Sequence, residues 1–228
     1  MQNDDAQPRI KIQKNSSYKV TGLVRLSKQG VIYDGDGIPI DHETENEYPL
    51  QEEMRLCRCG KSANKPFCDG VHVKVEFDGT ERATKKRNFK RLSGPTLILH
   101  DDEDLCYGPG FCHLAGGTWE LTEKSGKPKA RELAIRTAKL CPSGRLVMED
   151  RDTGEMLEPD YEPSIVIEED YNKGVSGPLL IRGNIVIESA DGEEYQVCNR
   201  AALCRCGESH NKPFCDGTHE VTGFRDDK

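Results

Sequence analysis

Two sets of cysteine and histidine residues share one spacing, Cys-x-Cys-x8-Cys-x3-His. The first set is Cys57, Cys59, Cys68 and His72, and the second is Cys204, Cys206, Cys215 and His219. Thiolates and imidazoles bind thiophilic metals and iron–sulfur clusters, and four such donors complete one site. The sequence therefore predicts two four-ligand sites for a thiophilic metal or an iron–sulfur cluster.

The two sets belong to a repeated segment, because residues 57–72 recur as residues 204–219. Three positions differ, and they are Lys61/Glu208, Ala63/His210 and Val71/Thr218. In each copy, two cysteines one residue apart can reach the same metal from an extended loop. The third cysteine and the histidine lie on one face if that cysteine begins a helical turn. We expect the substitutions beside identical ligands to give the two sites similar spectra and different midpoint potentials.

Residues between the ligands are expected to shape this turn. Asp69 and Asp216 follow the third cysteine of each set, where a carboxylate accepts amide hydrogens at the start of a helical turn. Gly70 and Gly217 come next and allow the backbone to pass close to an inorganic centre.

Two other uses of these cysteines stay open. Three cysteines and one histidine also form zinc sites, although those usually begin with Cys-x2-Cys. A disulfide scaffold would use an even number of cysteines, and the chain has ten. However, the sequence Met-Gln-Asn-Asp-Asp-Ala-Gln at the start has no basic segment followed by an apolar one. We therefore expect no signal peptide, and a reducing, cytoplasmic location.

Composition limits the class of protein. The chain has 228 residues, of which 35% are hydrophobic and 32% are charged, so several small domains, each stabilised by a metal, are expected rather than one large core. The net charge of −8 argues against a nucleic-acid binder. No apolar run approaches the roughly 18 residues that span a bilayer, so we also expect no membrane partner.

Short strands precede both sets. Residues 18–26 alternate in polarity and predict a strand, and residues 41–49 predict an acidic loop. Residues 177–189 and 194–198 predict strands before the second set, and Cys198 in the last of these is expected to have only a structural role. The repeat is therefore a β-rich domain rather than a ligand loop alone.

The repeated pattern Cys-x-Cys-x2-Ser-x3-Pro-x-Cys-Asp-Gly-x-His resembles the motif of the CDGSH (mitoNEET-like) iron–sulfur family. The resemblance implies one [2Fe-2S] cluster in each copy, held by three cysteines and one histidine. By position, the Cys-x-Cys pair would bind the inner iron and the later Cys and His the outer iron. Val71 stands where the family has Ser, Thr or Ala, so local hydrogen bonding is expected to differ there.

A third group of cysteines lies between the copies. Cys106, Cys112 and Cys141 surround the clearest helical pattern, residues 129–140, and strands are expected at 96–100, 145–149 and 164–168. Residues 95–150 resemble single-cluster bacterial ferredoxins, including divergent relatives that end in Cys-Pro-Ser-Gly. Pro109 stands at the position of one ferredoxin cysteine. The resemblance implies a [3Fe-4S] centre, or a [4Fe-4S] centre with water or His113 as fourth ligand. The alternative is three buried cysteines in a domain that has lost its cluster.

The expected fold class is α+β. It comprises a loose N-terminal tail (residues 1–17), a first β-rich CDGSH-type domain (18–92), a ferredoxin-like α/β sandwich domain (93–173) and a second CDGSH-type domain (174–228). Because members of the family assemble as dimers, we expect the two copies to pack as an intramolecular pseudo-dimer.

The expected function is electron transfer or redox sensing by two [2Fe-2S] clusters, with no enzymatic activity. A neutral histidine donates less charge than thiolate, so it raises the reduction potential above that of all-cysteine ferredoxins. The alternative function is an iron–sulfur cluster carrier, and a weaker one is a subunit of a redox enzyme. The partner would accordingly be a redox protein or an apo-protein that accepts a cluster.

Overall fold

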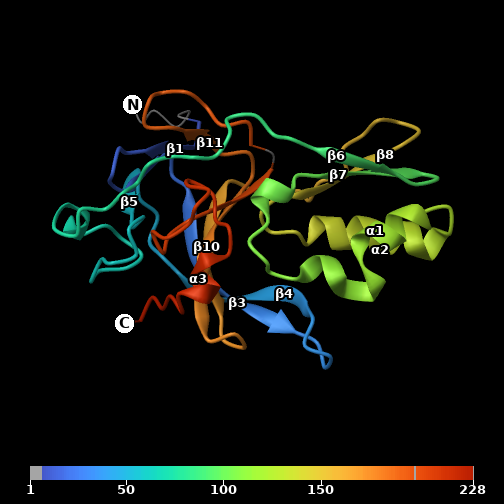
Figure 1. Cartoon of the computed structure of the whole chain (residues 1–228), viewed down its shortest axis with the longest axis horizontal. Helices are drawn as coiled ribbons and strands as arrows, with labels where there is room; N and C mark the ends of the chain where they lie inside the picture. The colour runs from blue at the N-terminus through green and yellow to red at the C-terminus, as the bar shows by residue number, and fades with distance from the viewer. Residues whose placement is uncertain (1–6, 198, 228) are drawn as a thin grey trace.

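The computed structural model describes residues 7–197 and 199–227, which form three β-sheets and a few short helices (Figure 1). The fold is mixed α and β, with most of its regular structure in sheets. Cys198 lies outside the described residues. Within the described ranges, no helix combines the length and apolar character needed to cross a bilayer.

A four-stranded sheet contains strands from both ends of the chain. Its order is β11 (Val186–Glu188), β1 (Arg9–Ile12), β2 (Tyr18–Thr21) and β5 (Glu53–Leu56). β1 pairs antiparallel with β2 and parallel with β11. The expectation of a loose tail up to residue 17 is therefore wrong for β1, whose Ile10 and Ile12 are buried in the core.

A five-stranded sheet also combines the two halves. Its order is β12 (Arg200–Leu203), β10 (Val175–Arg182), β9 (Ser164–Asp170), β3 (Arg25–Tyr33) and β4 (Pro39–Glu47). β3 and β9 pair in parallel, and β9 and β10 form an antiparallel pair. Two expectations are corrected here. The acidic loop is the edge strand β4, and the boundary after residue 173 falls between two strands of one sheet.

These two sheets share the main hydrophobic core. Ile10 and Ile12 of β1 pack with Ile165 and Ile167 of β9. The next side chain along β9, Val166, points to the opposite face, where it packs against a separate buried cluster. β9 and β10 are thus covered on both faces, which explains their apolar runs at residues 165–167 and 179–181.

The middle of the chain forms a third sheet covered by helices. β6 (Lys90–Ser93), β7 (Leu97–Asp101) and β8 (Leu146–Asp150) are antiparallel. α1 (Thr118–Glu123) and α2 (Pro128–Lys139) pack on this sheet, as Figure 1 shows. Short 3₁₀ turns, η2 (Glu103–Leu105) and η3 (Phe111–Gly116), connect β7 to α1. The strands expected at 96–100 and 145–149 and the helix at 129–140 are confirmed within one residue.

Candidate metal centres

Each ligand set begins where an edge strand ends. β5 ends one residue before Cys57, and β12 ends one residue before Cys204. The chain then folds back on itself, because the amide of Cys57 donates to the carbonyl of Pro66 at 2.7 Å and that of Cys204 to Pro213 at 2.8 Å. The same backbone hydrogen bond therefore closes both ligand loops.

The donors of each set lie in pairs at metal-binding distances. The sulfurs of Cys57 and Cys59 are 3.8 Å apart, and Cys68 Sγ lies 3.3 Å from His72 Nδ1. Two sulfurs bound at about 2.3 Å to one tetrahedral metal are held roughly 3.8 Å apart, and a sulfur and an imidazole nitrogen slightly less. Each pair of the first set is therefore spaced to hold one metal atom.

The second set repeats this geometry. The sulfurs of Cys204 and Cys206 are 3.6 Å apart, and Cys215 Sγ lies 3.2 Å from His219 Nδ1. In the described part of the chain, no three Cys, His, Asp or Glu side chains gather around a single metal-ion position. The structure thus brings together all eight predicted donors as four pairs, two in each copy.

A short turn carries the histidine in each copy, but it begins three residues after the third cysteine rather than at it, because the preceding Gly70 and Gly217 have φ of 86° and 88°. The turns are η1 (Val71–Val73) and α3 (Thr218–Val221). Asp69 Oδ1 accepts the amide of Val71, and Asp216 Oδ1 accepts that of Thr218, both at 3.0 Å. Amide hydrogen bonds also hold the pKa of Asp69 below its usual value. The predicted role of the two aspartates is confirmed.

The substitution of Val71 for Thr218 changes one contact. Thr218 Oγ1 donates a hydrogen bond of 2.7 Å to Asp216, and Val71 has no hydroxyl to do so. The side chain of Val71 instead packs against the cluster formed by Cys57, Cys59 and Phe77. The backbone differs as well, because the turn is a 3₁₀ turn in the first copy and a short α-helix in the second.

The thiol of the second cysteine and neighbouring backbone amides favour the thiolate form of the first cysteine in each set. The Cys59 thiol and the amides of Ser62 and Gly60 lower the pKa of Cys57. The second copy repeats the arrangement around Cys204, whose pKa is lowered by Cys206 and by two backbone amides. Donors aimed at a sulfur stabilise an anionic ligand and the negative charge of a centre bound there.

Sequence reasoning missed the arginine between the paired cysteines. Arg58 is buried, donates to the carbonyl of Gly79 at 2.7 Å, and has its guanidinium 5.5 Å from the ring of Tyr18 and 5.6 Å from that of Phe77. The sequence has arginine at this position in both copies. The burial of the side chain could not be predicted from it, because its partners come from distant segments.

Arg205 is the matching residue in the second copy and has stronger partners. Its guanidinium contacts the carboxylates of Glu169 at 2.7 Å and Asp226 at 2.6 Å. It also donates to the carbonyls of Gly177 at 2.7 Å and Glu168 at 2.8 Å. This arginine therefore joins the second ligand loop to the five-stranded sheet and to the C-terminal segment.

The two ligand loops pack against each other reciprocally. A Cβ atom on Gly60 would lie 2.3 Å from the carbonyl oxygen of Cys206, and one on Gly207 would lie 2.7 Å from that of Cys59. Both glycines have positive φ, at 71° and 89°. The hydroxyl of Tyr18 also donates to the carbonyl of Cys204 at 2.7 Å. Glycine is required at both positions by close contact as well as by backbone conformation.

The three middle cysteines line one cavity of ≈ 180 Å³, together with Pro109 and His113. Cys106 follows η2, Cys112 lies in η3 and Cys141 follows α2. Burial raises the pKa of Cys112 to about 11. The three thiols predicted to act together are therefore brought to the same cavity by two neighbouring 3₁₀ turns and the end of α2.

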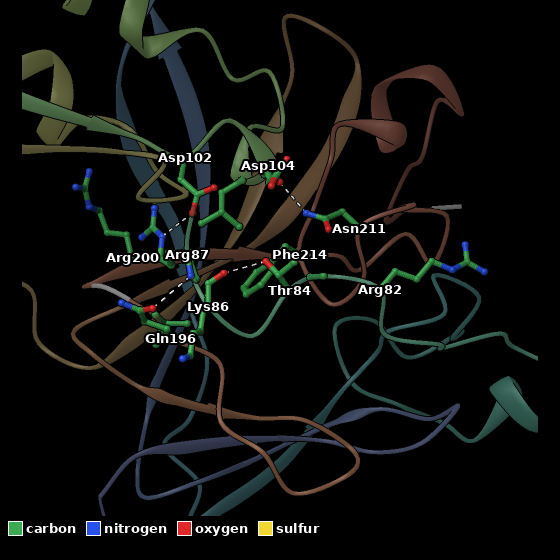
Figure 2. A pocket seen from close by; sticks show the side chains of 14 residues that line it. Arg82, Thr84, Lys86, Arg87, Asp102, Asp104, Gln196, Arg200, Asn211 and Phe214 are labelled. Atoms are coloured by element: carbon green, nitrogen blue, oxygen red, sulfur yellow. Dashed lines mark hydrogen bonds and ion pairs between the residues drawn. The ribbon is translucent and has the colours of Figure 1, made fainter. Parts of the chain in front are cut away.

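A second cavity, of ≈ 230 Å³, lies where the middle segment meets the second copy (Figure 2). The ion pair between Arg87 and Asp102, at 2.9 Å, forms part of its wall. Beside it, the side-chain amide of Asn211 donates to the carbonyl of Asp104 at 2.7 Å. This cavity marks the junction between the loop before Cys106 and the second ligand loop.

Comparison with known proteins agrees with the geometry. A family model described as an iron-binding zinc finger of CDGSH type matches residues 15–73 and 176–220. A model described as a divergent 4Fe-4S mono-cluster matches residues 92–151. No curated protein and no solved structure matches the chain. The chain therefore contains two regions of the CDGSH iron-binding type, and they flank a region of the divergent 4Fe-4S mono-cluster type.

Proposed function

We propose that the protein binds two [2Fe-2S] clusters, each through three cysteines and one histidine, and acts in electron transfer or redox sensing. The observation that carries this proposal is the pairing of donors. Four pairs, each spaced for one tetrahedral metal atom, match two binuclear centres. In this proposal the chain is not itself an enzyme, and it works with an external redox protein in the cytoplasm, where the ligand thiols stay reduced.

The residues of the chain prepare each site for such a group. Cys57 and Cys59 would hold one iron, and Cys68 and His72 the other, with the matching residues in the second copy. A bound cluster of this kind takes up and releases one electron, and its histidine ligand raises the reduction potential. Backbone amides stabilise the thiolates of Cys57 and Cys204, and the buried arginines fix the Cys-x-Cys segments.

The two copies would act as an intramolecular pseudo-dimer. The reciprocal contacts of Gly60 with Cys206 and of Gly207 with Cys59 support this part of the proposal. We further propose that the middle segment is a ferredoxin-like sandwich that holds a third, [3Fe-4S] or [4Fe-4S], cluster on Cys106, Cys112 and Cys141. Its support is the sheet covered by two helices and the shared cavity of the three thiols.

Iron and sulfide counts test the proposal on protein purified without oxygen. Two [2Fe-2S] clusters give about four iron atoms per chain, and a third cluster raises the count to about seven or eight. The variants C57S/C59S and C204S/C206S should each lose two iron atoms, and C112S should remove only the excess above four. Zinc in place of iron, with no visible absorption and no EPR signal after reduction, would contradict the proposal.

A second candidate function is cluster transfer to apo-proteins. Its support is the first copy, where Cys68 and His72 are partly exposed to solvent. A carrier should lose its visible absorption when an apo-ferredoxin is added. An electron carrier should instead cycle reversibly with its clusters retained.

A further inference from the structure

The middle segment covers the second ligand set but not the first. Four contacts join residues 104–108 to the loop of the second set. Besides the hydrogen bond between Asn211 and Asp104, a Cβ atom on Gly217 would lie 2.8 Å from the carbonyl oxygen of Tyr107. The ring of Tyr107 lies 6.0 Å from that of His219. Lys173 bridges the carbonyl of Gly108 and the carboxylate of Glu220, at 3.2 Å and 2.6 Å.

Tyr107 is a fixed part of this cover. Its side chain is 2% exposed and packs with Val166, Leu180 and Cys215. Its hydroxyl donates to Glu168 at 2.9 Å. His219 beneath it is only 3% exposed. The second ligand set is therefore closed by a segment that belongs to the core.

Among the described residues, no counterpart of residues 104–108 covers the matching face of the first copy, where Ser16 Oγ lies 3.0 Å from His72 Nε2. A Cβ atom on Gly70, the counterpart of Gly217, would meet nothing within 4 Å. Asn64, the counterpart of Asn211, is exposed, and His72 is partly exposed. Val73, next to this histidine, is 74% exposed. The same backbone surface is thus filled in one copy and open in the other.

Charge also distinguishes the two faces. Residues 61–76 carry three lysines and two acidic residues, whereas the matching residues 208–223 carry one lysine and three acidic residues. The segment that forms the open face is therefore more positive than its counterpart, although the whole chain has a net charge of −8. A partner with an acidic surface would approach this face in preference to its closed counterpart.

We infer that the open face of the first copy, around His72 and Val73, is the docking surface for an external acidic ferredoxin. The equivalent face of the second copy is already occupied by a ferredoxin-type cysteine loop, residues 104–108, which shows the kind of segment that fits it. One electron leaves the reduced ferredoxin and one enters the first site, and no covalent bond forms or breaks. The inference rests on the proposed function, because it assumes a redox centre in each copy.

Two single-site proteins test the inference. C204S/C206S keeps the first site, and C57S/C59S keeps the second. A reduced single-cluster [4Fe-4S] ferredoxin is mixed with each oxidised protein, and the bleaching of the [2Fe-2S] absorption is followed by stopped flow. We expect the first site to be reduced faster by about ten-fold or more, with a rate that falls as salt is added. Equal rates, or faster reduction of the second site, would overturn the inference.

Surface variants of the intact chain distinguish docking of the ferredoxin on this face from a mere difference in solvent exposure of the two sites. Val73→Asp should slow the reaction with ferredoxin by about five-fold or more, because it places a negative charge on the docking face. The matched control is Val221→Asp, beside the closed His219, where the valine is 90% exposed. It should leave the rate unchanged. An unchanged rate in Val73→Asp would refute the docking surface but would leave the proposed function standing.

Hydrogen exchange gives a readout that does not depend on electron transfer. Adding the ferredoxin should protect the amides of residues 64–75 and leave those of residues 211–222 unchanged. Protection confined to the second segment would overturn the inference. Absence of [2Fe-2S] clusters from the purified protein would instead defeat the proposed function, so the two failures are distinguishable.

Discussion

Replacing Arg205 by methionine is expected to destabilise the whole fold. The guanidinium is buried between Glu169 and Asp226, and it donates to two backbone carbonyls. Methionine fills much of the volume but supplies no donor. The carboxylate of Glu169, which is 2% exposed, would keep the hydrogen bond from Ser176 and the more distant cation of Lys28, at 3.8 Å.

The size of the loss follows from these contacts. Removing one partner of a buried ion pair costs about 3–5 kcal/mol, and each carbonyl left without a donor adds about 1 kcal/mol or more. Lys28 offsets part of this, so we expect the free energy of unfolding to fall by about 4 kcal/mol. For a chain of this length that lowers Tm by roughly 10 °C.

Thermal melting of the purified protein, followed by visible and far-ultraviolet circular dichroism, measures the effect. Arg225→Met is the control, because that arginine lies nearby and pairs with the exposed Asp227. Adding Glu169→Gln to the Arg205→Met protein removes the unpaired charge and should restore part of the lost Tm. The reasoning would be refuted if Arg205→Met had the same Tm as the parent protein, or if adding Glu169→Gln to Arg205→Met lowered Tm further.

Three further expectations concern the ligand loops. Thr218→Val removes the hydrogen bond from the Thr218 hydroxyl to Asp216 and should destabilise the second loop by about 1 kcal/mol. The absorption of the second site should then bleach faster in urea, and an unchanged bleaching rate would count against a stabilising role of this hydrogen bond. Gly60→Ala should lower the iron content of both sites, because the added Cβ would clash with the backbone of Cys206. Gly70→Ala is the control and should retain iron, because Gly70 has a similar positive φ but open space around it. Equal iron contents in the two variants would contradict the close contact between Gly60 and Cys206. Removal of the metal with a chelator should loosen both ligand loops, because their donors bind the metal only in the folded state. Limited proteolysis should then cut within residues 57–72 and 204–219. An unchanged cleavage pattern would show that the metal does not hold these loops in place.

The local features of the sites could be predicted from the sequence because they depend on spacing. Cys68 Sγ lies beside His72 Nδ1, as a four-residue separation implies. Asp69 accepts the first amide of the turn that carries His72, as a carboxylate at that position implies. The helix α2 was equally visible, because its apolar residues recur at helical period. These predictions rest on residues that interact with near neighbours along the chain.

The missed features depend on contacts between distant segments. β4 is an edge strand whose residues are mostly exposed, so it has no apolar alternation to reveal it. β1 has four residues, and its partner β11 lies near the other end of the chain. Arg58 and Arg205 carry a charge that is usually found on the surface, and only their tertiary partners make burial favourable.

The parallel pairing of β1 with β11, and of β3 with β9, has a consequence for biogenesis. The four-stranded and the five-stranded sheet each need strands from both halves of the chain. Neither sheet can therefore be completed during the early part of synthesis. Loops of this length slow the search for native contacts. The first ligand set leaves the ribosome long before β11 is made, and metal insertion into a finished site must therefore wait until nearly the whole polypeptide has been translated.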